Sequence, residues 1–230
     1  MADLSVSDAA RRLRLHVTRV RALLRAGDLK GRKVGGRWLV DEFGVRARTE
    51  RSGQDGRPFS ARRAWAYLLL LSGEGVPWID PATRSRLRGR IREGPTERIL
   101  PRLRRRARVE YFRAGPSALR TIAALEGFVA SGVSAADRYE ASVVARDQVD
   151  GYVREAQLRD ARYRLALDPA DETQANVILR VSPLRAALHG RKVAPPAAVA
   201  VDLMESADQR TRRAGIELAE RLRADRIASR

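Results

Sequence analysis

Apolar residues recur at helical spacing in two short runs near the start of the chain. The first run begins beside Ser5 and Ser7, both able to cap a helix N-terminus, and the second ends at Gly27, a residue typical of helix C-caps. The apolar positions of these runs are Ala9, Ala10 and Leu13, then Val17, Val20, Leu23 and Leu24. Two short helices separated only by residues 14–16 are typical of a helix-turn-helix.

The stretch RKVGGRWLV, residues 32–40, predicts a β-hairpin directly after these helices. Gly35 and Gly36 can supply the positive φ angles that a two-residue hairpin turn requires. The apolar residues expected to anchor the hairpin in a core are Val34, Trp38 and Val40. The cations that flank the turn are Arg32, Lys33 and Arg37.

The sequence VSDAARRLRLHVTRVRALLRAGDLKGRKVGGRWLV resembles the excisionase- and MerR-type winged helix-turn-helix, over residues 4 to about 45. The family's A-A-x-x-L, G-[DE]-L and G-x-R-W motifs fall in register with the predicted helices and hairpin. The resemblance implies that the second helix reads base edges through Thr18, Arg19 and Arg21, with His16 and Arg25 at the periphery. It also implies that phosphates are bound by Arg32, Lys33 and Arg37. For any single arginine, the alternative is that it only solvates the surface.

Two residues depart from the family pattern. Arg14 stands in the turn where the family usually has glycine, which predicts a looser or strained turn. His16 stands at the start of the second helix in place of the usual serine. Its side chain either caps that helix or contacts a phosphate, and the sequence does not separate these two roles.

The rest of the chain predicts a larger domain of helices with a few strands. Its expected elements are a helix after Ser60 with Trp65, Leu68, Leu69 and Leu71 in the core, a helix from Pro81, a strand in ARVEYFRA (107–114), a helix after Pro116, helical spacing over Val149, Tyr152, Val153 and Leu158, a strand over 176–181, and helices over 197–206 and 208–222. We therefore expect a mainly α fold with small β elements (α+β). The expected domains are a winged helix-turn-helix over 1–48, a Gly-rich linker over 49–58 and a helical or α+β domain over 59–230.

The C-terminal stretches ANVILRVSP and VAPPAAVAVDLMESADQRTRRAGIEL resemble the end of AbiEi-type antitoxins of type IV toxin–antitoxin systems. Ala175 replaces the glycine of that family's G-N-[VI]-x-L strand, whereas its D-L and D-x-R motifs are kept. The resemblance implies an antitoxin encoded beside a nucleotidyltransferase-like toxin. Asp202, of the D-L motif, is expected to be a structural carboxylate, with Arg210 or Arg213 as its partner.

The net charge of the chain also favours a polyanionic partner. The 230 residues contain 46 Lys and Arg against 28 Asp and Glu, a formal net charge of +18. Such an excess favours nucleic acid, an acidic protein or an anionic membrane surface. Nearly all of the cations are arginine, so a GC-rich coding bias is an alternative explanation. The arginines at 84, 86, 88, 90 and 92 are expected to spread around a helix, and whether they meet DNA stays open.

The sequence lacks the residues that several functional classes require. The chain has no cysteine, which excludes disulfides and thiolate metal sites. Its two histidines, His16 and His189, lie in different modules, so we expect neither a histidine metal site nor a Ser-His-Asp arrangement. No phosphate-binding G-x-x-x-x-G-K-[ST] loop is present, and no cofactor or enzymatic activity is expected. The apolar run 64–71 is too short for a membrane span of about 18 residues, which predicts a cytoplasmic, nucleoid-associated protein.

These patterns together predict a sequence-specific transcriptional regulator that binds double-stranded DNA, namely an autorepressing antitoxin with a cognate toxin. One alternative is an excisionase-like or plasmid-maintenance architectural protein without a toxin. Another is an interaction protein that neutralises a toxin and for which DNA contact is secondary. Because one helix-turn-helix contacts few base pairs, we expect a homodimer or a cooperative oligomer on DNA.

Overall fold

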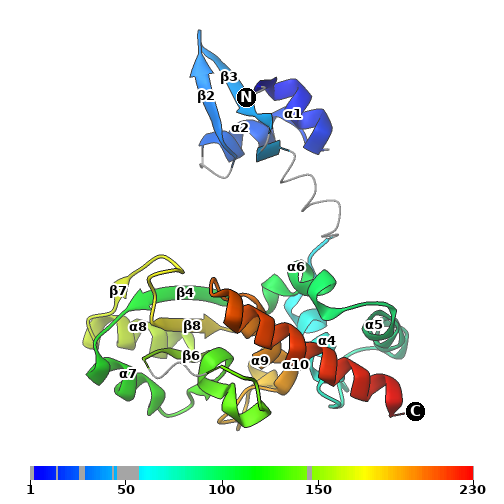
Figure 1. Cartoon of the computed structure of the whole chain (residues 1–230), viewed down its shortest axis with the longest axis vertical. Helices are drawn as coiled ribbons and strands as arrows, with labels where there is room; N and C mark the ends of the chain where they lie inside the picture. The colour runs from blue at the N-terminus through cyan, green and yellow to red at the C-terminus, as the bar shows by residue number, and fades with distance from the viewer. Residues whose placement is uncertain are drawn as a thin grey trace. The chain divides into compact units, whose positions relative to one another are not determined.

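The computed structural model describes residues 3–13, 15–25, 29–42, 44–45, 57–143 and 147–229 (Figure 1). The chain divides into two compact units, Met1–Arg57 and Pro58–Arg230. The predicted α+β class is confirmed, since helices predominate and two small sheets accompany them. The predicted turn residue Arg14, the helix cap Gly27 and residues 49–56 of the predicted linker lie outside the described residues. In the part of the chain that the structure describes, no helix is long and apolar enough to cross a membrane.

In the part of the N-terminal unit that the structure describes, two helices pack against a three-stranded sheet, and residues 42, 44 and 45 are also helical. Its elements are β1 (Asp3–Ser5), α1 (Val6–Leu13), α2 (Val17–Arg25), β2 (Gly31–Val34) and β3 (Arg37–Asp41). The sheet has the order β1-β3-β2 and is antiparallel throughout. The Ser5 hydroxyl accepts a hydrogen bond from the amide of Asp8 at 3.1 Å, so the predicted cap of the first helix is present. All seven apolar positions predicted from helical spacing face the core of this unit.

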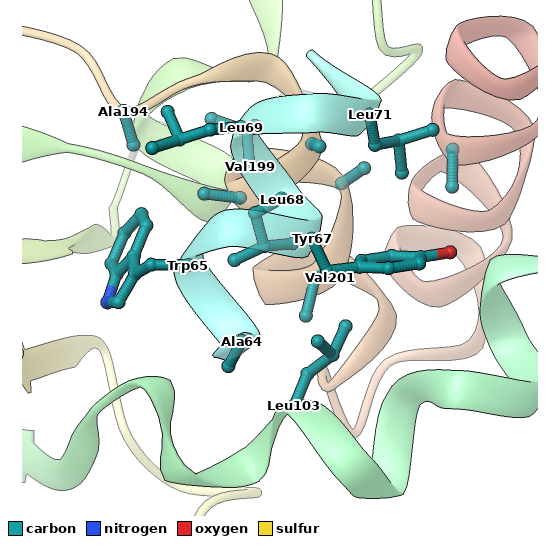
Figure 2. Close-up of a cluster of buried hydrophobic side chains, with 14 of the residues drawn as sticks. Ala64, Trp65, Tyr67, Leu68, Leu69, Leu71, Leu103, Ala194, Val199 and Val201 are labelled. Atoms are coloured by element: carbon teal, nitrogen blue, oxygen red, sulfur yellow. The ribbon is translucent and has the colours of Figure 1, made fainter. Parts of the chain in front are cut away.

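The larger unit is built around one helix, α4 (Ala61–Leu71), whose N-cap is Ser60 as predicted. The sequence indicated one strongly apolar side, but every residue from Ala64 to Leu71 is buried. Figure 2 shows Val199, Val201 and Leu103 packed around this helix. A helix that is apolar all round must be enclosed by other elements, and α4 accordingly contacts the helices described next.

Four of these helices surround α4, and two more lie elsewhere in the unit. The helices around α4 are α5 (Pro81–Glu93), α6 (Leu100–Leu103), α9 (Pro196–Met204) and α10 (Gln209–Ala228). The other two are α7 (Pro116–Ala123) and α8 (Glu155–Arg164). Pro81 lies at the start of α5 and Asp208 caps α10, both as predicted, although α10 continues beyond the expected end at 222.

A five-stranded mixed sheet completes the larger unit. Its strands are β4 (Arg108–Arg113), β5 (Val129–Ala130), β6 (Val149–Tyr152), β7 (Asp168–Pro169) and β8 (Val177–Val181), in the order β5-β6-β8-β4-β7. Only β6 and β8 are parallel, with Val149 opposite Val177. Their carboxyl ends therefore lie at one edge of the sheet, beside the start of β4, where Arg108 pairs with Val181. Helices α7 and α8 pack on one face, and side chains of the other face point toward α9.

One sequence prediction of secondary structure was wrong. Residues 149–152 form a strand rather than part of a helix, and the helix begins only at Glu155. All four residues of this strand are buried, because helices or loops cover both faces of the sheet. A strand buried on both faces lacks the alternation of apolar and polar residues that identifies a half-buried strand.

Candidate nucleic-acid interface

The second helix of the N-terminal unit presents a polar face opposite its buried side. Val20, Leu23 and Leu24 are buried against the rest of the unit. The side chains that α2 exposes include Thr18, Arg19, Arg21 and Arg25. Among the described residues, none of these three guanidinium groups has a hydrogen-bond or ion-pair partner. The helix therefore exposes three positive charges on its solvent side.

His16 caps this helix. Its ring Nδ1 lies 3.1 Å from the Thr18 hydroxyl oxygen and 3.4 Å from the Thr18 amide nitrogen, which donates to it. Its carbonyl oxygen accepts the amides of Arg19 at 2.9 Å and Val20 at 3.2 Å. Of the two roles that the sequence left open, the structure thus shows the cap. Because the residue is exposed, its ring faces the solvent beside the polar side of α2.

The hairpin formed by β2 and β3 has the predicted two-residue turn. Gly35 and Gly36 have φ angles of 53° and 78°, the left-handed conformations that such a turn needs. Val40 is fully buried and Trp38 packs against the core, as predicted. The prediction for Val34 was wrong, because this side chain is 50% exposed. Val34 lies beside the turn, beyond the part of the hairpin that covers the two helices.

The cations of β2 point to opposite faces of the sheet. Lys33 pairs with Trp38, whereas Arg32 pairs with Leu39, and neighbouring residues of a strand alternate between faces. Arg32 donates to the Asp3 carboxylate on β1 at 2.7 Å. The hairpin therefore presents Lys33 on one face and an already paired Arg32 on the other. At Arg37, the structure shows the backbone pairing with Val34 across the hairpin.

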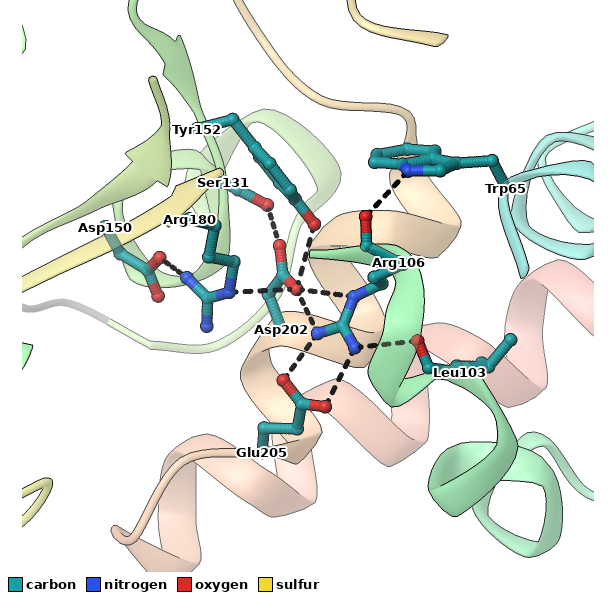
Figure 3. A network of polar contacts seen from close by, with 9 residues as sticks. All are labelled: Trp65, Leu103, Arg106, Ser131, Asp150, Tyr152, Arg180, Asp202 and Glu205. Carbon is teal, nitrogen blue, oxygen red and sulfur yellow. Dashed lines mark hydrogen bonds and ion pairs between the residues drawn. The ribbon is translucent and has the colours of Figure 1, made fainter. Parts of the chain in front are cut away.

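The most extensive polar cluster of the larger unit lies inside its core (Figure 3). The guanidinium of Arg106 contacts Asp202 Oδ1 through Nη2 at 2.5 Å and through Nε at 3.2 Å. Its Nη1 also donates to Glu205 at 2.8 Å. Arg180, the fourth of the five residues of β8, lies 3.2 Å from the same Asp202 oxygen and pairs with Asp150. Two buried cations are thus held by three carboxylates, of which Asp150 and Asp202 are also buried whereas Glu205 is partly exposed.

Ionisation within this cluster follows from its charges. Burial opposes the charged form of Asp202, but the guanidinium groups of Arg180 and Arg106 outweigh burial and hold its pKa below the usual aspartate value. Burial, reinforced by the charge of Asp202, raises the pKa of the Tyr152 phenol well above its ordinary value. The phenol therefore stays protonated and donates to Asp202 Oδ1 at 3.2 Å. Ser131 donates to the other carboxylate oxygen, so Asp202 is fully satisfied.

Asp202 is the structural carboxylate that the sequence predicted, but its partners were predicted wrongly. Arg210 and Arg213 lie on the exposed side of α10, and Arg213 pairs with Glu217 at 3.0 Å. The true partners, Arg106 and Arg180, come from distant parts of the sequence. A lone arginine in the apolar strand VILRV was a signal for a buried partner, whereas Arg106 in the run Arg104–Arg106 resembled a surface residue.

The carboxylates of this cluster all have structural partners. Each of its carboxylates is engaged by a guanidinium, and among the described residues no group of His, Asp or Glu could hold a metal ion. The D-L and D-x-R motifs of the C-terminal half have structural roles here. Asp202 is part of the core, and Asp208 caps α10 by accepting the amide of Thr211 at 2.7 Å.

Comparisons with known proteins bear on the N-terminal unit alone. Residues 4–51 match the family described as the helix-turn-helix domain. Neither the curated proteins nor the solved structures gave a significant match to the chain. The resemblance of the C-terminal half to AbiEi-type antitoxins consequently has no support from these comparisons. The matched residues include the exposed polar face of α2, its cap and the hairpin. The chain thus carries an N-terminal helix-turn-helix domain, a module that points to DNA binding.

Proposed function

We propose that this protein is a sequence-specific DNA-binding transcriptional regulator that acts on the DNA upstream of its own gene. The observation that carries the proposal is the exposed face of α2, where Arg19, Arg21 and Arg25 have no partner among the described residues. Cations without an intramolecular partner can bind DNA without first breaking an ion pair. The second helix of a helix-turn-helix is also the one that enters the major groove.

The two ends of α2 have different roles in this proposal. In helix-turn-helix proteins, base edges are read by residues near the start of the recognition helix. Thr18, Arg19 and Arg21 lie there, and arginine is suited to the O6 and N7 acceptors of guanine. Arg25 lies in the last turn and serves as a phosphate contact, as does the exposed ring of His16 beside the first turn.

The hairpin contributes phosphate contacts rather than base contacts. Lys33 is exposed and has no partner among the described residues, so it is the most available cation of β2. Arg32 must first leave Asp3, which lowers its contribution. We include Arg37 among the proposed phosphate contacts because it follows the same turn and corresponds to the arginine of the G-x-R-W motif. Contacts of this kind fix the orientation of the protein without reading sequence.

A single domain of this size contacts few base pairs, so we propose that two copies bind neighbouring half-sites about one helical turn apart. We do not extend the proposal to a toxin partner, because only the motif resemblance of the C-terminal half points to one. Cytoplasmic location follows from the proposed action on DNA.

Fluorescence anisotropy with the full-length protein tests the function. The titrations use a labelled duplex from upstream of its own gene and a scrambled duplex, over a range of salt concentrations. Each phosphate contact should contribute about −0.9 to the slope of log K against log salt. We expect Arg19→Ala with Arg21→Ala to remove the preference for the native duplex, by roughly ten- to several-hundred-fold in affinity.

The matched control removes the same charge from the other unit. Arg159→Ala with Arg164→Ala alters two exposed arginines of α8 and should leave the preference for the native duplex unchanged. If wild-type protein binds both duplexes equally, the regulator proposal is wrong. Equal binding accompanied by strong bending of the DNA would instead favour an architectural protein.

A further inference from the structure

The larger unit contains a pocket at the edge of its sheet where the two parallel strands end. Its volume is about 1150 Å³. Tyr152 and Val153, at the end of β6, and Val181 and Ser182, at the end of β8, form part of its wall. In sheets with parallel strands covered by helices, ligands bind outside the carboxyl ends of these strands. This volume is slightly above the range of about 300–1,000 Å³ that is typical of small-molecule sites.

The floor of this pocket is apolar. It consists of the more buried lining residues, since Val129, Tyr152 and Val153 are buried and Val181 and Leu188 are partly buried. The Tyr152 hydroxyl is held by Asp202. Turns that include Gly127 and Gly190 bound its sides, with φ angles of 77° and 72°. The floor could therefore accept a flat apolar group, and the turns limit how far a longer ligand extends.

The rim of the pocket is positively charged. Five arginines line it against two glutamates, Glu126 and Glu155. Glu155 is already engaged by Arg108 at 2.6 Å, and Arg191 pairs with Glu74. Arg104 and Arg105 are exposed and have no partner among the described residues. A pocket that keeps unpaired cations above an apolar floor is suited to an anion that carries an apolar group.

The two unpaired arginines extend from a rigid part of the backbone. They belong to the 3-10 turn Arg104–Arg106, whose third residue is anchored in the core by Asp202 and Glu205. Trp65 fixes the same turn by donating its indole N–H to the Arg106 carbonyl at 3.0 Å. Preorganised cations lose less conformational freedom on binding than cations on a flexible loop. The buried cluster thus positions Arg104 and Arg105, two exposed residues of the pocket lining.

We propose that this pocket binds a nucleotide, with its phosphates on Arg104 and Arg105 and its base on the apolar floor. Guanidinium groups recognise phosphate oxygens through two parallel hydrogen bonds, which suits adjacent arginines to a di- or triphosphate. An inorganic anion would leave the floor unused. The pocket lies wholly in residues 58–230. The proposal of nucleotide binding can therefore be wrong while the proposal of DNA binding is right, and the reverse also holds.

Isothermal titration calorimetry on the full-length protein at physiological salt tests the assignment. The probes are ATP, GTP, CTP and UTP, with pyrophosphate, an unphosphorylated nucleoside and a short single-stranded RNA for comparison. We expect at least one nucleoside triphosphate to bind more tightly than pyrophosphate and the nucleoside. Arg104→Ala with Arg105→Ala should weaken it by about tenfold or more, because hydrogen bonds to charged groups are lost.

Two further variants separate the parts of the site. Leu188→Ser changes the apolar floor and should lower the affinity for the nucleotide without lowering the affinity for pyrophosphate. Arg159→Ala with Arg164→Ala removes the same charge away from the pocket and should leave the affinity unchanged. Because Arg104 and Arg105 are exposed, their replacement should not lower the thermal unfolding temperature, which serves as the control for folding.

The assignment is overturned by any of four results. The first is that no nucleotide binds, and the second is that the control variant loses as much nucleotide affinity as the Arg104→Ala, Arg105→Ala variant. The third is that pyrophosphate binds as tightly as the nucleotides and Leu188→Ser has no effect. The fourth is that RNA binds far more tightly than any nucleotide through the same two arginines. The last result would identify a nucleic-acid strand as the ligand.

Discussion

Arg106 and Asp202 form an ion pair that is almost completely shielded from water, with 2.5 Å between Nη2 and Oδ1. The two residues are distant in the sequence, since Arg106 comes just before β4 and Asp202 lies on α9. The pair therefore joins the turn that leads into β4 to helix α9. Its charges are stable only together, because a buried charge without a partner is very costly.

Replacement of Asp202 by asparagine should strongly destabilise the larger unit. The change keeps the shape of the side chain but leaves Arg106 and Arg180 short of one negative charge. Loss of one partner of a buried pair costs about 3–5 kcal/mol. Urea unfolding measures the effect, in a Trp38→Phe background so that fluorescence reports only on Trp65 and Trp78. Asp160→Asn, at an exposed position of α8, is the matched control and should change the stability little.

Stability of the larger unit should fall in acid because of the same carboxylate. The pKa of Asp202 is lower in the folded protein than in the unfolded chain, where it is about 3.9. Its contribution to the free energy of unfolding is therefore complete above that value and is lost as the pH falls toward the folded pKa. Urea unfolding between pH 7 and pH 3 measures this loss. The Asp202→Asn variant should show a weaker dependence on pH below about 4, and an identical dependence would contradict the assigned role.

Gly215 should not tolerate even a methyl group. A Cβ atom there would lie 2.6 Å from the Ala200 carbonyl oxygen and 2.6 Å from the Met204 amide nitrogen, because α9 and α10 pack closely at this point. Gly215→Ala should therefore cost about 1–3 kcal/mol despite the better helix propensity of alanine. Thermal unfolding measures the change.

A glycine in another helix provides the matched comparison. At Gly89, in α5, the nearest atom to an added methyl group would be Glu93 Oε1 at 3.6 Å, an ordinary contact. Gly89→Ala should stabilise the protein by up to about 1 kcal/mol, because alanine is the better helix former. Equal effects of the two substitutions would contradict the close packing of α9 on α10.

Asp3→Asn should strengthen DNA binding if Arg32 contacts a phosphate. The carboxylate of Asp3 holds the Arg32 guanidinium at 2.7 Å, and both side chains are accessible to water. Because exposed pairs are weak, we expect the affinity to rise roughly two- to fivefold. The anisotropy titration measures the gain. The gain should vanish in the Asp3→Asn, Arg32→Ala double variant, and its persistence there would exclude Arg32 as the responsible contact.

The helix-turn-helix could be predicted from sequence because its signals are local. The spacing of Ala9, Leu13, Val20 and Leu24 and the paired glycines of the hairpin each depend on residues a few positions apart. The exposure of Thr18 and Arg21 followed from the same periodicity. Strand β1 gave no such signal, because Asp3–Ser5 pairs with a strand more than thirty residues away.

Features that depend on long-range contacts could not be predicted in the same way. Arg106 follows two exposed arginines, and only the approach of α9 makes it a core residue. The pocket combines segments that lie far apart in the sequence, and no short motif marks it. The strand at 149–152 was missed because burial on both faces removes the alternation that would identify it.

The complete enclosure of α4 has a consequence for how this sequence can diverge. A surface helix has a solvent side on which substitutions accumulate at little cost, but the eight residues from Ala64 to Leu71 have none. A polar residue at any of these positions would have to be accommodated by neighbours on α5, α9 or α10. Among related chains, we therefore expect this segment to vary least and to exchange only apolar residues of similar volume, with compensating changes in the helices around it.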